Sequence, residues 1–322
     1  MNAAMTGFTW EPLAPTFGAD IIGLDISESI HPAVGCELRE LWNERGLLRF
    51  RGTALDAPGF LALSSVFGEL EVHPAKENHA EGYPNLLTME YDPADRAGTA
   101  IYEVDGEELA NWQPWHIDMI YTTRMDRGGL LQAKVVPPYG GRTGFIDRVA
   151  LLADMPASLR KRVEGKRVMY QIEPCFDKAR FLPWHVRMVN KPDRLARLEE
   201  RRATDMPVVS HPAVMRHPVT GVDSLAISPV HSTGFENMDE AEGTALLEEV
   251  VNYIVNAPGK FFQEWQVEDI VLWDNWRFVH MAGGCPTGHA RHLYRAGVKG
   301  DYSEGRVSSH NTGKVEAWAS TV

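Results

Sequence analysis

The sequence has few cysteines and no run of apolar residues long enough to cross a bilayer. Its three cysteines are widely spaced and odd in number, so they form neither a disulfide framework nor a thiolate metal site: Cys36, Cys175 and Cys285. The first ten residues lack the basic start and the apolar stretch of a signal peptide. These absences predict a mature, soluble protein of the reducing cytoplasm.

Positive charge is also scarce. The chain has 32 lysine and arginine residues against 44 aspartate and glutamate residues, which gives a net charge of -12. Binding to nucleic acid depends on clusters of lysine and arginine, and no such cluster or glycine-rich phosphate loop is present. The sequence also lacks internal repeats and long linkers, so we expect one globular domain over residues 1–322 with no nucleic-acid or membrane partner.

Short strands separated by turns dominate the pattern that is present. Strands alternate with helices expected near 32–46, 57–67, 148–164 and 239–256, and the charged run 191–202 is interpreted as a solvated helix face. Residues 129–136 and 142–147 are expected to pair as a hairpin around Pro137 to Gly141. This pattern favours a mainly β fold with helical decoration (α+β), a double-stranded β-helix or jelly roll. The polar segment 76–110 is predicted to act as a lid, with a plain surface loop as the alternative.

The stretch Asn111 to Asp118 carries the strongest chemical signal. His116 and Asp118 are two residues apart, and an extended strand turns both side chains to the same face. A third ligand is available far downstream in His280. Two histidines and one carboxylate on one side of a metal form the facial triad of non-haem Fe(II) oxygenases, which leaves the opposite coordination positions open.

Large apolar residues surround the His-x-Asp pair, which favours a dry pocket over a solvated strand face: Trp112, Trp115, Met119, Ile120 and Tyr121. Alone, the pair is weak evidence, because histidine and aspartate often occur two residues apart on exposed strands. Arg291 is a candidate for binding a carboxylate through its planar guanidinium, and Thr143 offers a hydroxyl donor. An arginine without a metal site nearby is more often part of a surface ion pair.

Several separated motifs, taken together, resemble one family. They are His116-Ile117-Asp118, Gly140-Gly141-Arg142-Thr143, Trp273-Asp274-Asn275 with His280, and Arg291 with Arg295. Their order and spacing are similar to the taurine dioxygenase and 2,4-dichlorophenoxyacetate dioxygenase family of Fe(II)/2-oxoglutarate oxygenases. The resemblance covers about residues 13–300, and several motifs at matching spacing are more specific than any one of them.

The resemblance implies the cofactors and the roles of individual residues. His116, Asp118 and His280 would hold Fe(II) and form the catalytic centre, and Thr143 and Arg291 would bind the cosubstrate 2-oxoglutarate. Arg295 would face the cosubstrate or the substrate. Family likeness also implies a homo-oligomer, either a dimer or a tetramer. The expected reaction consumes O2, releases succinate and CO2, and oxidises an unactivated C-H bond, most simply by hydroxylation.

The substrate is expected to be a small organic acid with an aromatic or bulky apolar body. The predicted substrate-binding residues are His73, Lys76, Trp112, Met119 and Arg295. Lys76 and Trp112 differ from the residue types of the taurine enzyme, so taurine itself is disfavoured. Two alternatives stay open at this point: a zinc-dependent hydrolase, which the same His/Asp/His site would suit, and a non-catalytic jelly-roll binding module. The hydrolase would leave Thr143 and Arg291 without a function.

Overall fold

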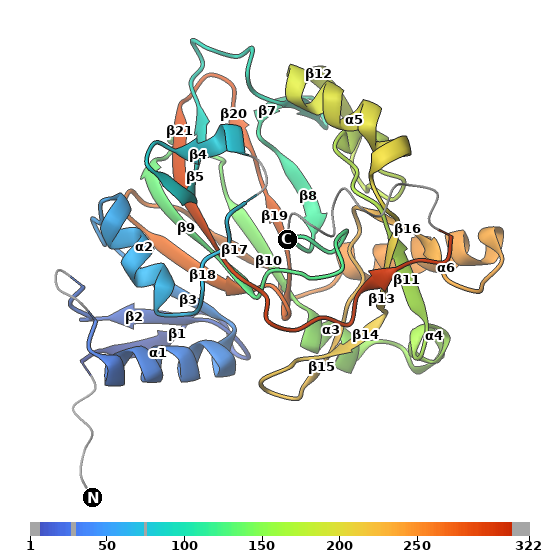
Figure 1. The fold of residues 1–322 in the computed structure, drawn as a ribbon, viewed down its shortest axis with the longest axis horizontal. Coiled ribbons are helices and arrows are strands. Elements are labelled where there is room, and N and C mark those ends of the chain that lie inside the picture. The colour runs from blue at the N-terminus through green and yellow to red at the C-terminus, as the bar shows by residue number, and fades with distance from the viewer. Residues whose placement is uncertain (1–6, 27–29, 74–75, 311–322) are drawn as a thin grey trace, which may run out of the picture.

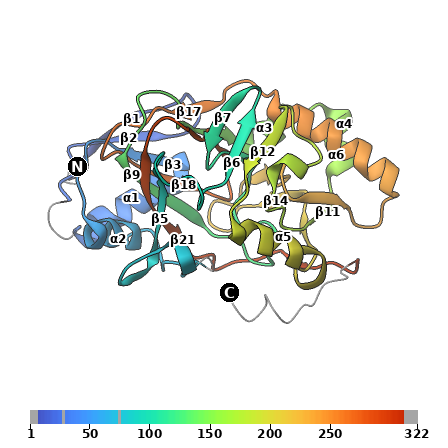
Figure 2. The ribbon, with the colours of Figure 1, turned by 90° about the horizontal axis from the view of Figure 1, so that it is seen from above.

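The computed structural model describes residues 7–26, 30–73 and 76–310. Two β-sheets form its centre (Figures 1 and 2). Within the described residues, the larger sheet has eight strands in the order β1 (Thr9–Pro12), β2 (Ala19–Ile22), β3 (Leu47–Phe50), β18 (Ile270–Asp274), β9 (Gly128–Val135), β21 (Arg291–Val298), β5 (Tyr83–Tyr91) and β4 (His79–Ala80). The smaller sheet, counted over the same residues, has four strands in the order β17 (Phe261–Gln263), β10 (Thr143–Asp147), β19 (Phe278–Ala282) and β8 (Gln113–His116).

A layer of large side chains joins the two sheets face to face. Phe145 on β10 and Phe278 on β19 pack against side chains from four strands of the larger sheet: Leu47, Leu131, Ala133, Val271, Trp273 and Leu293. Successive residues of β18 alternate between this inner layer and the opposite face, as the period of a strand requires. The arrangement is the double-stranded β-helix that the sequence predicts.

Helices cover the outer faces of both sheets. In both views α1 (Pro32–Arg45) and α2 (Ala57–Ser65) lie at one end of the molecule, and α4 (Ala157–Val163) and α6 (Glu240–Val255) lie at the other. The first pair packs on the larger sheet, where Trp42 and Phe60 join one buried cluster. The second pair joins α3 (Arg148–Asp154) in a cluster that also contains Trp115 of β8 and Val279 of β19. Both sheets are therefore covered on the side away from their shared layer.

Local signals explain where these helices begin and end. Pro32 occupies the first turn of α1, His31 caps it by accepting a hydrogen bond from the Ala33 N–H, and Gly46 ends it in the left-handed region at φ 72°. Asp239 caps α6 by accepting from the N–H groups of Ala241 and Glu242. The predicted helices near 32–46, 57–67 and 239–256 are confirmed.

The remaining elements decorate this centre. One further sheet has the order β12 (Val186–Asn190), β6 (Ile101–Val104), β7 (Glu107–Ala110) and β20 (Cys285–Pro286). Another has the order β16 (Ser232–Phe235), β11 (Arg167–Tyr170), β13 (Val209–Pro212) and β22 (Arg306–Val307). The other elements are the strand pair β14 (Val214–Arg216) and β15 (Asp223–Leu225), the short 3-10 helices η1 (Lys76–Asn78) and η2 (Phe176–Lys178), and α5 (Asp193–Asp205). The charged run falls on α5, and none of its described side chains is buried. The segment 76–110 contains η1 and β4 to β7, and its role as a lid stays a prediction.

Two expectations from the sequence are wrong. Strands β9 and β10 do not pair as a hairpin, because β9 pairs with β18 and β21 in the larger sheet while β10 pairs with β17 and β19 in the smaller one. The turn between them crosses from one sheet to the other. The helix expected over 148–164 is two helices, α3 and α4, which are separated at Pro156. A proline disfavours the helical conformation of the residue before it, and Met155 is extended at ψ 131°.

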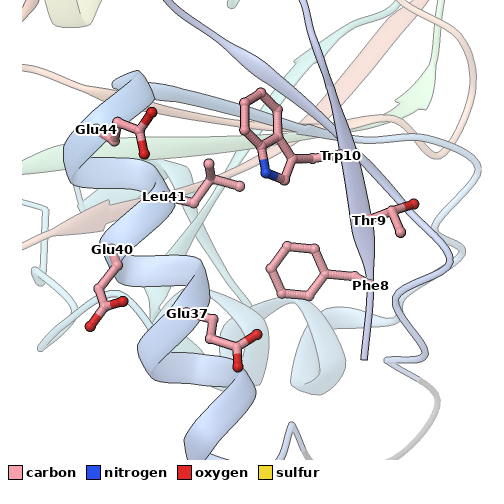
Figure 3. Close-up of a pocket in the computed structure, with 7 residues that line it drawn as sticks. All are labelled: Phe8, Thr9, Trp10, Glu37, Glu40, Leu41 and Glu44. Atoms are coloured by element: carbon pink, nitrogen blue, oxygen red, sulfur yellow. The ribbon is translucent and has the colours of Figure 1, made fainter. Parts of the chain in front are cut away.

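Outside the sheets, a cleft of about 500 Å³ lies between β1 and α1 (Figure 3). Phe8 and Trp10 form one side, and Glu37, Glu40 and Glu44 of the helix line the other. None of the residues that line this cleft belongs to the motifs identified in the sequence. Within the described residues, no helix combines the length and the apolar character needed to cross a membrane.

Candidate metal centre

Two strands of the smaller sheet and the turn after one of them bring the predicted ligands together. His280 on β19 pairs across the sheet with His116, the last residue of β8, and their ring centroids are 4.1 Å apart. The Asp118 carboxylate lies 3.3 Å from His116 Nε2 and 3.5 Å from His280 Nε2. One ligand atom from each of the three residues lies within 4.8 Å of the others. All three side chains are at least largely buried.

The surroundings of the two imidazoles suit metal binding. His116 Nδ1 lies 2.7 Å from the Pro114 carbonyl oxygen and donates to it, which leaves Nε2 as the nitrogen that faces Asp118. Burial and the nearby His116 ring lower the pKa of His280 to about 4, so this imidazole is neutral at neutral pH. A neutral imidazole has a free lone pair on one nitrogen, which a metal ligand requires.

Asp118 lies beyond the end of its strand, which differs from the sequence-based interpretation. Strand β8 ends at His116, and Asp118 begins a turn in which Met119 has a φ of 55°. Arg295 Nη2 donates to Asp118 Oδ2 at 2.5 Å. Burial opposes ionisation, but the charges of Arg295 and the histidines hold the pKa of the Asp118 carboxyl well below its usual range. The predicted ligand set is therefore assembled by a turn and not by one continuous strand.

Aromatic side chains form the walls behind the triad. Phe145 stacks on the His280 ring with centroids 6.3 Å apart, and Trp273 lies 5.0 Å from the same ring. Both belong to the layer between the sheets and are almost completely buried. Trp115, which the sequence placed beside the metal pocket, packs in the cluster on the outer face of the smaller sheet. The interior next to the triad is thus apolar, as the sequence predicts, but its walls come from other strands.

The predicted carboxylate-binding arginine is buried and only partly hydrogen-bonded. Arg291 lies on β21, and its Nη2 donates to the Gly141 carbonyl oxygen at 3.0 Å. Its Nε has no hydrogen-bond partner among the described residues, although the residue is only 5% exposed. Burial lowers the pKa of Arg291 to about 10, which leaves it charged at neutral pH. Thr143, two residues beyond Gly141, accepts a hydrogen bond from Trp265 Nε1 at 3.1 Å.

The residues predicted to bind substrate lie in different surroundings. Burial and the charge of Arg295 lower the pKa of His73 to about 4, and Asp118 also acts on this ring, so His73 lies close to the centre. Met119 is buried, and its sulfur accepts a hydrogen bond from the Tyr121 hydroxyl at 3.4 Å. Lys76 is exposed in η1.

Trp112 is buried in an aromatic cluster. Its ring packs edge-on against Trp184 at 5.6 Å and lies 5.8 Å from Tyr102, with Phe176 in the same group. This packing is compatible both with a role in the core and with a role as a pocket wall, so the substrate-binding role of Trp112 stays a prediction.

Three residues near the centre had no assigned role in the sequence. Asp126 is buried, and its surroundings include Asp118 and Arg295. His231 has a φ of 75°, and its ring packs edge-on against Tyr121 at 4.9 Å. Asn275 contacts the Asp118 main chain through its side chain. Asn275 belongs to a motif visible in the sequence, but Asp126 and His231 lack any local signal because only the fold brings them to the triad.

Comparison with known protein families identifies the chain. Residues 9–296 match the family described as taurine catabolism dioxygenase TauD, TfdA family. The chain belongs to this family. Members of the TauD/TfdA family are oxygenases that use 2-oxoglutarate, so the protein is an enzyme of that class, with Fe(II), 2-oxoglutarate and O2 as its cofactors. The match does not support the zinc-dependent hydrolase or the non-catalytic binding module.

Relatives of known activity cover most of this TauD/TfdA chain. It is 29% identical over 290 residues to an alpha-ketoglutarate-dependent 2,4-dichlorophenoxyacetate dioxygenase of Cupriavidus pinatubonensis, covering 88% of this chain and 95% of the relative. It is 26% identical over 303 residues to an (S)-phenoxypropionate/alpha-ketoglutarate-dioxygenase of Sphingobium herbicidovorans, covering 94% and 99%.

Solved structures confirm the fold of this TauD/TfdA enzyme. A taurine dioxygenase from Burkholderia xenovorans superimposes with a TM-score of 0.70 at 22% identity, covering 92% of each chain. AAD-2 in complex with Mn(II) and N-oxalylglycine superimposes with a TM-score of 0.69 at 20% identity, covering 92% of this chain and 98% of that one. At these identities, the likeness supports the double-stranded β-helix alone.

Proposed function

We propose that this enzyme hydroxylates an unactivated C-H bond of a small organic acid with an aromatic or bulky apolar body. In the balanced reaction, substrate, 2-oxoglutarate and O2 give hydroxylated substrate, succinate and CO2. The observation that carries the proposal is the buried triad of His116, Asp118 and His280, which shares one interior with Arg291 and Arg295 of β21. This site combines a metal-binding face with two cations that suit carboxylates.

The triad fits Fe(II) on the chemistry of its donor atoms. His116 offers Nε2 because its Nδ1 is committed to the Pro114 carbonyl, and His280 is neutral through burial. Asp118 is ionised and supplies the single negative charge. We assign these residues as the iron ligands and the catalytic centre. Bound iron would supply the oxidising chemistry by activating O2 together with 2-oxoglutarate.

Arg291 is assigned to the distal carboxylate of 2-oxoglutarate. A buried guanidinium that lacks a carboxylate partner is costly, and the unpaired Nε of Arg291 provides a donor for one. Thr143 contributes its hydroxyl, which already accepts from Trp265 and therefore has its own proton available to donate. Together, they would fix the end of the cosubstrate that is remote from the metal.

Arg295 and His73 are assigned to the substrate acid at the other end of the centre. Arg295 directs one nitrogen at Asp118, and its guanidinium has further N–H donors that can reach an incoming carboxylate. The Trp273 ring lies 5.9 Å from this guanidinium and screens it from one side. Trp112 and Met119 would contact the apolar body of the substrate, and Lys76 would lie at the mouth of the pocket. The aryloxy acids named for the two curated relatives support this class of substrate.

Two measurements test the proposal. Anaerobic addition of Fe(II) and 2-oxoglutarate should produce a visible charge-transfer band between the iron and the keto acid, and the band should be lost in Asp118→Ala. Succinate formation is then measured with a panel of aryl carboxylates, aryl sulfonates and taurine. We expect aryl acids to couple succinate formation to their own oxidation. We expect Trp112→Ala to lower the affinity for these acids more than the affinity for 2-oxoglutarate.

Trp10→Ala is the matched control, because Trp10 is exposed and lines the cleft beside α1. Efficient coupling by taurine without a response to any aryl acid would refute the substrate class. The predicted homo-oligomer, the cytoplasmic location and the lid at 76–110 remain parts of the proposal. Size-exclusion chromatography with light scattering tests the first of them.

A further inference from the structure

The main chain of Asp118 is held by a side chain and not by a neighbouring strand. Strand β8 ends two residues earlier, so the pairing with β19 does not reach Asp118. Instead the Asp118 N–H donates to Asn275 Oδ1 at 3.0 Å, and Asn275 Nδ2 donates to the Asp118 carbonyl at 2.9 Å. The amide of Asn275 thus makes the pair of hydrogen bonds that a strand partner would otherwise provide.

Asn275 also holds the far end of the same turn. Its Nδ2 donates a second hydrogen bond, to the Asp126 carbonyl at 3.1 Å. Both N–H groups and the oxygen of the amide are therefore used, and the residue is completely buried. Aspartate at this position would replace the Nδ2 donor by an oxygen, which would face the Asp118 and Asp126 carbonyl oxygens without a proton to share. Alanine would leave three buried main-chain groups without partners, so only an amide of this length satisfies the site.

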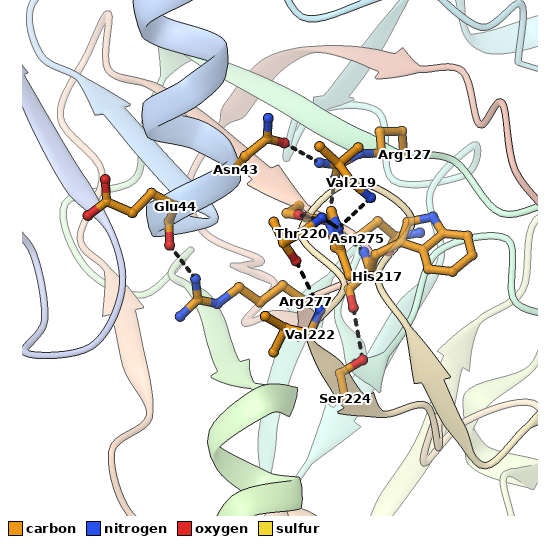
Figure 4. A network of polar contacts seen from close by, with 12 residues as sticks. Asn43, Glu44, Arg127, His217, Val219, Thr220, Val222, Ser224, Asn275 and Arg277 are labelled. Atoms are coloured by element: carbon orange, nitrogen blue, oxygen red, sulfur yellow. Dashed lines mark hydrogen bonds and ion pairs between the residues drawn. The ribbon is translucent and has the colours of Figure 1, made fainter.

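A buried ionic cluster fixes Asn275 itself. The Asn275 N–H donates to the Arg127 carbonyl at 3.1 Å, and the Asn275 carbonyl accepts from Arg148 Nη2 at 3.1 Å. The adjacent Asp274 pairs with Arg127 at 2.6 Å and with His217 at 2.9 Å. Figure 4 shows Asn275 beside Arg127 and His217 in this network. The amide is consequently a rigid support and not a mobile side chain.

We propose that Asn275 is a positioning residue that holds the Asp118 carboxylate at the distances from His116 and His280 that metal binding needs. The inference rests on the proposed role of the triad as metal ligands. The Asn275 side chain hydrogen-bonds to the Asp118 N–H and carbonyl and not to the ligand atoms, so its effect passes through the Asp118 main chain. Removal of a residue that orients a metal ligand typically lowers metal affinity about 10- to 100-fold. We expect a loss of about the same size when Asn275 is removed.

The test measures Mn(II) affinity by calorimetry without 2-oxoglutarate or substrate, so that activity is not the readout. We expect Asn275→Ala to raise the Kd for Mn(II) by about 10- to 100-fold and to broaden the electron paramagnetic resonance spectrum of bound Mn(II). Asn275→Ser, which is neutral and small and can satisfy only part of the three main-chain groups, should weaken binding as well and guards against failure of the alanine variant to fold.

The matched control is Asn43→Ala. Asn43 Oδ1 accepts from Arg127 Nη2 at 2.8 Å, so this variant disturbs the same cluster without touching Asp118. We expect it to lower the melting temperature while the Kd for Mn(II) stays within about 2-fold.

Two outcomes separate this inference from the proposed function. Wild-type Mn(II) affinity in folded Asn275→Ala or Asn275→Ser would overturn the positioning role, as would an equal loss in Asn43→Ala. Wild-type affinity in His116→Ala would instead show that the triad is not the metal site, and the proposed function would fail with it.

Discussion

At the scale of single residues, the buried charges of the site differ in how far other described residues compensate them. Arg291 is the clearest example, because it is charged, buried and hydrogen-bonded only through Nη2 among the described residues. Asp118 and Arg295 compensate each other directly at 2.5 Å. This difference supports the proposed roles, in which Arg295 acts on the metal side of the centre and Arg291 binds a carboxylate of 2-oxoglutarate.

Arg291→Ala should therefore raise the 2-oxoglutarate concentration that gives half-maximal succinate formation. Loss of one partner of a buried, hydrogen-bonded charge pair costs on the order of 2 to 5 kcal/mol, which corresponds to at least about 30-fold. The iron affinity should be unchanged, because Arg291 does not contact the triad residues. Arg142→Ala is the control, since Arg142 is exposed and lies next to Thr143. An unchanged 2-oxoglutarate dependence would transfer the role to Arg295.

The buried carboxyl of Asp126 should make the stability of the metal-free protein depend on pH. Burial and the Asp118 charge raise the pKa of the Asp126 carboxyl to about 7 in the folded state. The folded state thus keeps a proton that the unfolded state loses near pH 4. Stability from this group is complete below about pH 4 and is lost as the pH rises to 7, by up to about 4 kcal/mol.

Asp126→Asn should remove this dependence because asparagine does not titrate. Urea unfolding should find the variant more stable than wild type at pH 8 and equally stable near pH 4. The control Asp301→Asn changes an exposed carboxylate and should leave the pH profile as it is in wild type. Parallel profiles for wild type and Asp126→Asn would contradict the raised pKa of Asp126.

At the scale of elements, two neighbouring strands of the larger sheet set the wall behind the triad. Gly129 on β9 lies opposite Trp273 on β18, and a Cβ at Gly129 would come within 2.5 Å of the Trp273 indole. The indole in turn lies 5.0 Å from the His280 ring. Gly129 therefore determines how far Trp273 sits from a metal ligand.

Gly129→Ala should push Trp273 toward His280. Overpacking of this kind costs typically about 1 to 3 kcal/mol, and we expect a matching loss in the free energy of unfolding together with weaker Mn(II) binding. Gly288→Ala is the control, because a Cβ there meets no heavy atom within 4 Å and the residue has no positive φ. If the two variants had the same free energy of unfolding, the side chains between the sheets could rearrange around Gly129→Ala without loss of stability.

Periodicity predicted most elements but not how they associate. The strand signals at 129–136 and 142–147 were correct as β9 and β10, but alternation carries no information on the sheet that each strand joins. The short turn between them favoured a hairpin, whereas the jelly roll uses it to cross between sheets. The end of β8 at His116 was also invisible, because the hydrogen bonds that replace the strand at Asp118 come from Asn275, 157 residues away.

At the scale of the whole molecule, the ligand set could be predicted because its motifs are specific and occur in a fixed order. His116, Asp118 and His280 come together as expected. The residues that support them could not be predicted. Phe145 lies beside His280 because β10 pairs with β19 within the smaller sheet, and His231 comes from the segment just before β16 in another sheet. Asp126 follows Asp118 in the chain, but only the folded loop places its carboxyl within the field of Asp118 and Arg295. Sequence reasoning thus identified the chemistry, and the structure identifies what holds it in place.

Binding of the metal and of 2-oxoglutarate should each stabilise the folded protein, because the two ligands contact residues from different sheets. The proposed metal ligands come from the smaller sheet and the turn after β8, while Arg291 comes from β21 of the larger sheet. Because the keto acid end of 2-oxoglutarate would bind at the metal, Mn(II) and 2-oxoglutarate together should raise the melting temperature more than the sum of their separate effects. Each ligand at 100 times its Kd contributes about 2.7 kcal/mol.

Thermal unfolding of three proteins checks this order. Wild type should respond to Mn(II) and respond further when 2-oxoglutarate is added. Arg291→Ala should keep the response to Mn(II) and lose most of the further increase, since its metal ligands are intact. Asp118→Ala should lose both, because without the metal the cosubstrate has only the Arg291 end to hold. If 2-oxoglutarate stabilised Asp118→Ala as much as wild type, the cosubstrate would bind without the metal. The proposed coupling between the two sheets through the bound ligands would then be wrong.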